Sequence, residues 1–129
     1  MSTPPLPREF SPDILEADIL EEAAREIRTH CADDSWGDWG AVPDEEVPAH
    51  AFDNLFEDAL SYILYDVYGF ESEDVNDEGG KVLGVIRRIR IFTDYTVHEM
   101  RTHPHWFPPA KVAGSLEIKS KHLRNTAKK

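Results

Sequence analysis

The chain has 129 residues, 40% of them hydrophobic, and a formal net charge of −11 at pH 7. This length suits one domain with its own core, and three Trp, four Tyr and six Phe residues argue against an intrinsically disordered chain. No apolar run approaches the ~18 residues that span a bilayer, no signal peptide is visible, and the lone Cys31 cannot close an internal disulfide, so we expect a cytoplasmic protein with no membrane contact.

Residues 1–10 contain three prolines and are expected to form an extended arm. The next three residues can start a helix. Ser11 supplies an N-cap hydroxyl, Pro12 suits the first helical position, and Asp13 lies where the helix dipole favours an acid. Apolar residues then recur at steps of three and four as far as Cys31. The spacing predicts a helix over residues 12–31.

A loop rich in Gly, Pro and acidic residues follows over residues 32–47, and Pro48 can open a second helix. A broad apolar stripe then runs from Phe52 to Val67 at helical spacing. Gly69 is a natural end for this helix, because glycine tolerates the left-handed conformation that often terminates one.

Residues 70–80 form a second acidic loop, and the stretch that follows it is ambiguous. Apolar side chains from Val82 to Met100 fit one helical face, yet residues 88–91 alternate and eight positions between 82 and 97 are β-branched, which favours strand. The uninterrupted length indicates a helix of about 20 residues. A hairpin at 82–97, which would make the protein α+β, is the alternative.

The proline-rich residues 103–109 end this third helix, because the residue before a proline disfavours helical geometry. Residues 110–129 are basic and poor in apolar groups, and we expect a mobile tail there. The predicted architecture is mostly α: residues 11–109 form a single domain of three helices with acidic loops, between an extended N-terminal arm and a basic C-terminal tail.

Charge is divided unevenly along the chain. Residues 1–80 hold 22 carboxylates and three basic side chains, whereas residues 81–129 hold three carboxylates and eleven basic side chains. A surface that carries charge of one sign attracts a macromolecule of opposite charge. The uneven charge distribution along the chain is therefore informative about binding partners.

No motif indicates an enzyme or a metal site. The chain has no HExxH, no Cys-x-x-Cys and no nucleophile elbow. Residues 74–79 resemble the first half of a calcium loop, but the twelfth position, where a bidentate carboxylate is needed, is Val85. We therefore expect a protein that is not an enzyme, with no catalytic residue, no metal and no cofactor.

Trp36 and Trp39 stand three residues apart in the first acidic loop, outside any apolar stripe. Aromatic side chains surrounded by acid are typical of interface anchors. The alternative is that both fold back and cap the helical core, and the sequence leaves the two interpretations open.

These features predict a non-enzymatic inhibitor whose acidic surface covers a basic, nucleic-acid-binding surface of a partner protein. An immunity protein, an antitoxin or a phage-encoded anti-defence protein that mimics DNA would act in this way, on a nuclease or a similar effector. A homodimer is also compatible with the sequence. The candidate partner-binding residues are Asp33, Asp34, Trp36, Asp38, Trp39, Asp44, Glu45, Glu46, Asp53, Glu57, Glu71, Glu73 and Asp74.

The alternative function is a small regulatory or accessory protein that contacts nucleic acid through its basic residues 81–129. The same side chains could instead dock on the acidic part of this chain or of a neighbour. We favour docking, because a net charge of −11 repels DNA. The residues concerned are Arg87, Arg88, Arg90, Arg101, Lys119, Lys121 and Arg124.

Overall fold

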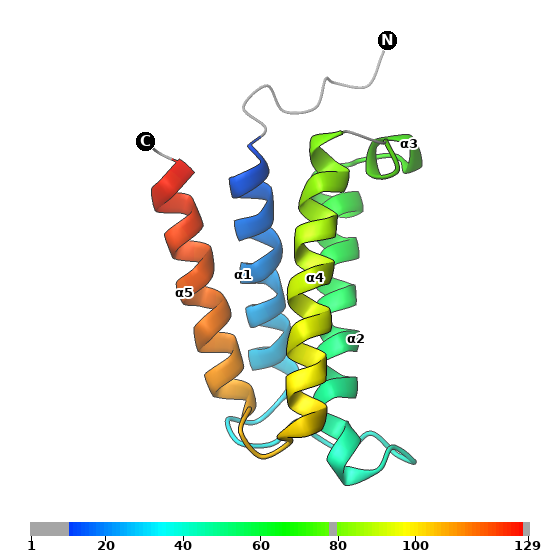
Figure 1. The fold of residues 1–129 in the computed structure, drawn as a ribbon, viewed down its shortest axis with the longest axis vertical. Coiled ribbons are helices and arrows are strands. Elements are labelled where there is room, and N and C mark those ends of the chain that lie inside the picture. Colours follow the sequence, from blue (N-terminus) through cyan, green and yellow to red (C-terminus); the bar gives the residue numbers. More distant parts are fainter. Residues whose placement is uncertain (1–10, 78–79, 128–129) are drawn as a thin grey trace.

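The computed structural model describes residues 11–77 and 80–127, and its regular structure there is entirely helical (Figure 1). Four long helices, α1, α2, α4 and α5, run along a common axis. The mostly α prediction is confirmed, and the hairpin alternative is not supported. The expected arm, residues 1–10, lies outside the described residues. No helix in the described ranges is both long and apolar enough to cross a membrane.

Helix α1 (Pro12–His30) begins as the sequence predicts, with the Ser11 side chain accepting a hydrogen bond from the backbone N–H of Ile14. It is the central helix, because it packs against α2, α4 and α5. Its burial therefore extends beyond the apolar stripe to two carboxylates, Glu16 and Glu22, which are 8% and 6% exposed.

Helix α2 (Val47–Ser61) follows a short 3₁₀ turn, η1 (Asp44–Glu46), and continues into a π-helical segment, η2 (Tyr62–Val67). A π-helix holds more residues per turn than an α-helix, so it rotates the buried stripe. Leu64 is buried as a result, and Val67, which the α-helical spacing placed on the stripe, is 53% exposed. Gly69 ends the segment with φ of 71°, in the left-handed region.

A four-residue helix, α3 (Ser72–Val75), precedes α4 (Lys81–Thr102). The buried positions on α4 include the β-branched residues Val82, Val85, Ile89 and Thr93, spaced by three and four. Packing of this single face against α1 and α2 outweighs the intrinsic strand preference of the β-branched residues, because sheet propensity depends on context.

Residues 109–127 correct the expectation of a basic tail, because they form α5 (Pro109–Ala127) and pack along α1. The buried face of α5 has Val112, Ala113, Leu116 and Ser120 at steps of one, three and four. Two of these four residues are small, so the stripe is weak in hydropathy but allows a close approach of the two helices. The hydroxyl of Ser120 donates to the backbone oxygen of Ala17 at 2.9 Å.

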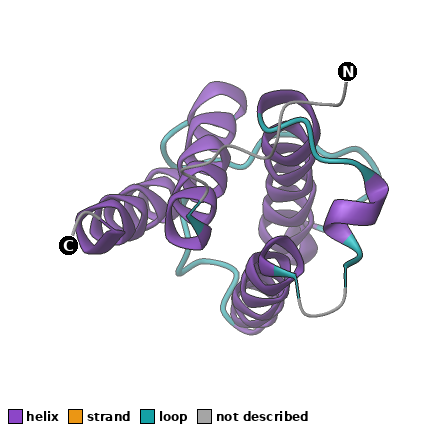
Figure 2. Cartoon of the chain, turned by 90° about the horizontal axis from the view of Figure 1, so that it is seen from above, coloured by secondary structure: helices purple, strands orange, loops and turns teal. Residues whose placement is uncertain are grey.

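The architecture is therefore a core of α1, α2 and α4 with α5 added on the outside of α1. Among the described helices, α5 approaches only α1 closely along its backbone. Seen along the bundle, α5 stands at one edge, next to the C-terminus (Figure 2). The loop between α1 and α2 and the segment between α4 and α5 meet at the same end of the bundle (Figure 1).

Candidate protein-binding surface

The predicted partner-binding residues fall into three groups that the fold keeps apart. Six acidic residues and both tryptophans lie between α1 and α2 or in η1, at one end of the bundle, and Asp53 and Glu57 lie on α2. Glu71, Glu73 and Asp74 lie in and next to α3, at the opposite end (Figure 1). The rise of α2 and η2 places about 30 Å between the end groups, so a partner would have to contact the whole length of the bundle to cover all of them.

We call residues 31–46 the acidic loop, and tight turns give it a defined shape. Gly37 and Gly40 have φ of 96° and 64°, conformations that side-chain-bearing residues rarely adopt. The N–H of Gly40 donates to Oδ1 of Asp38 at 3.0 Å, and the N–H of Gly37 donates to Oγ of Ser35 at 3.2 Å. These contacts hold the turns at Gly37 and Gly40 and orient the Asp38 carboxylate.

The two tryptophans of the acidic loop belong to the core rather than to an open anchor. Trp36 is 6% exposed, and its indole N–H donates to the backbone oxygen of Phe107 at 2.8 Å. Trp39 is half-buried, donates to the backbone oxygen of Trp36 at 2.8 Å and meets His50 edge to face. Both tryptophans therefore fold back and cap the helical core, the second of the two interpretations that the sequence left open. The buried Trp36 offers a partner little surface.

The next tryptophan lies near this end of the bundle but faces solvent. Trp106 is 59% exposed, and its ring stacks on His103 at a centroid distance of 3.7 Å. Its neighbour Phe107 is partly buried and packs against the core. An exposed aromatic side chain therefore stands close to the acidic loop, although it comes from the distant segment between α4 and α5.

Basic side chains of the C-terminal third form ion pairs with carboxylates of the N-terminal half. Arg88 pairs with Glu16 at 2.9 Å, and Arg90 pairs with Glu57. Arg101 pairs with Glu46 at 3.2 Å, at the end of the bundle where the acidic loop lies. Glu46 and Glu57, two of the predicted partner-binding residues, are therefore already neutralised within the chain.

Helix α5 is held on α1 by the same type of contact. Arg124 donates to Asp18 at 2.6 Å and to Glu21 at 2.7 Å, while Asp18 also accepts from the hydroxyl of Tyr68. Burial and the Asp18 carboxylate raise the pKa of Tyr68 far above its ordinary value. The tyrosine therefore stays a hydrogen-bond donor at all physiological pH values.

The remaining predicted basic residues do not form a continuous patch. Lys119 lies over the ring of Phe92 at 4.9 Å, and Lys121 is exposed on α5. Arg88 and Arg90 are two positions apart on α4, which places them about 200° apart around the helix. The structure therefore distributes the cations over separate faces, whereas acid predominates at the acidic loop.

Several exposed carboxylates have no ion-pair partner among the described residues. Asp34, Asp44 and Glu45 at the acidic loop are of this kind, as are Asp53 and Asp58 on α2. Asp58 was missed by the sequence analysis, although its place on the polar side of the second helix could have identified it.

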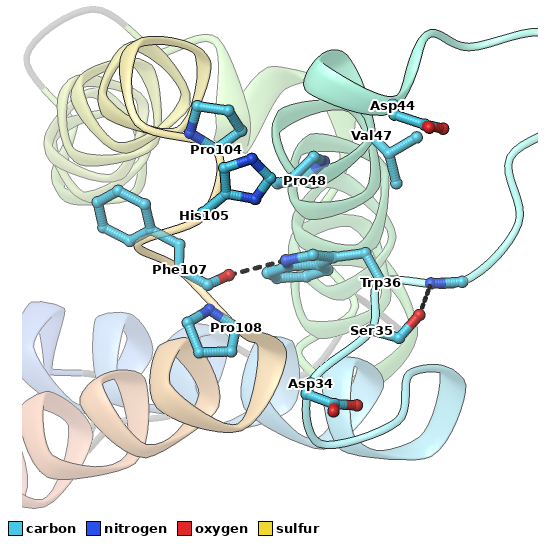
Figure 3. Close-up of a pocket in the computed structure, with 11 residues that line it drawn as sticks. Asp34, Ser35, Trp36, Asp44, Val47, Pro48, Pro104, His105, Phe107 and Pro108 are labelled. Atoms are coloured by element: carbon cyan, nitrogen blue, oxygen red, sulfur yellow. Dashed lines mark hydrogen bonds between the residues drawn. The ribbon is translucent and has the colours of Figure 1, made fainter.

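A cavity of about 290 Å³ lies beside Trp36, where the acidic loop meets the segment between α4 and α5 (Figure 3). We call it the Trp36 cavity. The sequence analysis missed it, because its walls come from segments about 70 residues apart; the aromatic and proline-rich composition of residues 103–109 was the available signal. Its lining residues are Asp34, Ser35, Trp36, Gly37, Asp44, Val47, Pro48, Pro104, His105, Phe107 and Pro108.

The single thiol of the chain, Cys31, is partly buried. Burial raises the pKa of the Cys31 thiol, which donates weakly to the backbone oxygen of Trp36. No group of three or more His, Cys, Asp or Glu side chains within residues 11–77 and 80–127 is placed to hold a metal ion.

No protein-family model, curated protein or solved structure matches this chain. The function must therefore be argued from the residues and their geometry.

Proposed function

We propose that this protein is a non-enzymatic inhibitor whose acidic surface binds and covers a basic, nucleic-acid-binding surface of another protein. One observation carries the proposal. Arg88, Arg90, Arg101 and Arg124 are engaged with carboxylates of the same chain, while exposed carboxylates at the acidic loop and on α2 have no such partner among the described residues. The charge left for an external partner is therefore negative.

Electrostatic steering supplies the mechanism. Carboxylates on a shaped loop and a rigid helix present negative charge at fixed positions, as the phosphates of a nucleic acid do. A nuclease or similar effector with a basic groove would be attracted at long range, and its substrate site would be covered on docking. Immunity proteins, antitoxins and phage-encoded anti-defence proteins are the classes in which such an activity is useful.

The proposal is tested by capturing the partner and measuring what the capture does. The tagged full chain is incubated with nuclease-treated lysate of the organism that encodes it, and bound protein is released by a salt step and identified by mass spectrometry. The captured protein is then assayed for nucleic-acid binding with and without this chain. Loss of nucleic-acid binding supports the proposal, and unchanged binding refutes it.

A matched pair of triple variants separates local charge from net charge. Asp33→Asn/Asp34→Asn/Asp38→Asn neutralises the acidic loop, and Asp58→Asn/Asp66→Asn/Asp94→Asn removes the same charge from α2, η2 and α4. The loop variant is expected to reduce the association rate more than the control, because charges near the contact steer most strongly. Equal losses would indicate attraction by net charge alone.

Nucleic acid as the direct ligand is an outcome that this experiment detects. If capture disappears after nuclease treatment, the regulatory alternative replaces the inhibitor. Deletion of residues 111–129 does not discriminate between the two functions, because α5 covers the core. Point substitution of exposed basic residues such as Lys121→Ala is the appropriate probe.

A further inference from the structure

The outer side of α4 exposes two large apolar side chains. Ile91 is 71% exposed and Tyr95 is 66% exposed, and their spacing of four residues places them next to each other on the helix. Ile91 lies two and a half turns from both Val82 and Met100, so it points directly away from the buried face. In Figure 1, α4 stands in front of α2, and no described helix lies over it. Adjacent apolar side chains on a helix face without a neighbour favour contact with another molecule.

These two residues belong to a stripe that repeats every seven residues along α4. Its positions are separated alternately by four and three residues, the spacing with which two α-helices pack side by side. We call this stripe the α4 seam, and its residues are Gly84, Arg88, Ile91, Tyr95, His98 and Thr102. The seam contains no acidic residue, although the chain has a net charge of −11. It therefore suits a neighbouring helix better than a basic partner.

The seam has the same spacing in both directions, so it can pair with a copy of itself. A two-fold axis at the level of Thr93 brings each position of the seam against a position of an antiparallel copy. Ile91 then faces Tyr95 of the second copy, and Tyr95 faces Ile91. At the two ends Gly84 faces Thr102, and the space beside Gly84 is open, with nothing within 4 Å of an added Cβ atom.

We propose that the α4 seam binds the same seam of a second copy of this chain, with the two α4 helices antiparallel. A parallel pair would place Arg88 against Arg88, and such like-charge contacts are unfavourable. In the antiparallel pair Arg88 comes level with His98 and Glu99 of the second copy. Arg88 and Glu99 lie about 20° apart around α4, on one flank of the seam. Arg88 donates to Glu16 through Nε, so its other N–H groups remain for the Glu99 carboxylate of the second copy.

The size of the seam sets the strength that we expect. The 22 residues of α4 extend about 33 Å. A single pair of helices with two large apolar side chains on each buries an area at the low end for specific interfaces. We therefore expect a reversible dimer with a dissociation constant of about 10–100 µM.

The response to salt separates this contact from the proposed inhibitor function, on which it does not depend. Both copies carry a charge of −11, so raising NaCl from about 0.05 to 0.5 M screens their repulsion and is expected to strengthen the dimer about two- to fivefold. Binding of a basic partner to the acidic loop is expected to weaken over the same range. A dimer that also weakens would be held by contacts between acidic and basic surfaces, which contradicts the proposal.

Sedimentation equilibrium of the full chain from about 5 to 500 µM measures the dimer directly. Ile91→Lys is compared with Ile118→Lys, which changes an isoleucine of 72% exposure on α5 and adds the same charge. The first is expected to weaken the dimer at least about tenfold, because it buries a charge at the centre of the contact, and the second less than about twofold. A wild-type chain that stays monomeric at about 500 µM, or equal weakening by both variants, would overturn the proposal.

Single-cysteine chains determine the orientation of the two helices. In a Cys31→Ser background, Ile91→Cys and Tyr95→Cys chains with tags of different size are mixed and oxidised. The mixed disulfide is expected to form at least about fivefold faster than either same-residue disulfide, because only facing positions come close enough to bond. Faster same-residue cross-linking would mean parallel helices and refute the antiparallel pair. Cross-linking no faster than that of Ile118→Cys in the same background would refute the contact itself.

Discussion

Replacing Leu116 by alanine is expected to lower the free energy of unfolding by about 3 kcal/mol, because it opens a cavity between α5 and α1. Leu116 is 1% exposed and lies on the α5 face that also buries Val112, Ala113 and Ser120. Buried leucine-to-alanine changes destabilise proteins by ~2–5 kcal/mol. A middle value is expected here because α5 packs mainly on one helix and can shift partly into the space.

The matched control is Ile118→Ala, two positions along the same helix. Ile118 is 72% exposed, so its truncation is expected to change the free energy of unfolding by no more than about 0.5 kcal/mol. Urea unfolding followed by circular dichroism at 222 nm measures both. With a denaturant slope of about 2 kcal/mol per molar urea, the Leu116 variant should unfold at a midpoint about 1.5 M lower.

Equal midpoints for the two variants would refute the reasoning. That result would mean that residues 109–127 do not bury Leu116 against α1, and the expectation of a mobile basic tail would be restored.

Three further changes test local physical chemistry. Gly69→Ala is expected to destabilise the fold by about 1 kcal/mol, because φ is 71° there, although space for the added methyl group is open. Gly114→Ala within α5 is expected to stabilise it by about 0.5–1 kcal/mol, because alanine loses less backbone entropy than glycine on folding. Thermal unfolding of both variants measures the difference. Burial raises the pKa of Glu22, so the folded state binds more protons than the unfolded state between the ordinary value of 4.5 and the raised value, and stability falls as pH rises through that window. Glu22→Gln should therefore be more stable than the wild type at pH 7, with the gap closing as pH falls toward 4.5, and a gap independent of pH would contradict this assignment. The Cys31 thiol, whose pKa is raised by burial, should react with iodoacetamide at pH 8 more slowly in the native protein than in urea, and equal rates would show that it is open to solvent.

The first two predicted helices were recognisable because each has a broad apolar stripe and a clear boundary, whereas the third stayed open to a hairpin because of its β-branched residues. Ser11 and Pro12 mark the beginning of α1, and Gly69 marks the end of η2. The exposure of the Val67 side chain could not be predicted, because the apolar spacing assumes an α-helix and no local sequence pattern indicates the π-helical segment. Helix α5 was missed because its contact face uses Ala113 and Ser120, whose hydropathy resembles that of a solvated segment.

The candidate surface was predicted in its charge but not in its shape. The acidic loop could be identified from composition, and the internal docking that we favoured is seen for Arg88, Arg90 and Arg101. Neither the burial of Trp36 nor the cavity beside it could be inferred, because both depend on the backbone oxygen of Phe107, 71 residues away. Contacts between distant segments leave little trace in local patterns.

The pairing of the first long helix with the last makes this helical protein unusually dependent on distant contacts. Ser120 and Ala17 are hydrogen-bonded across 103 residues. At a synthesis rate of about 5–20 residues per second, the ribosome would deliver α5 roughly 5–20 s after α1. During that interval the side of α1 that packs against α5 stays uncovered, and we expect the 22 carboxylates of residues 1–80 to repel one unfinished chain from another. The carboxylates that we propose for partner binding are therefore expected to limit association of nascent chains as well.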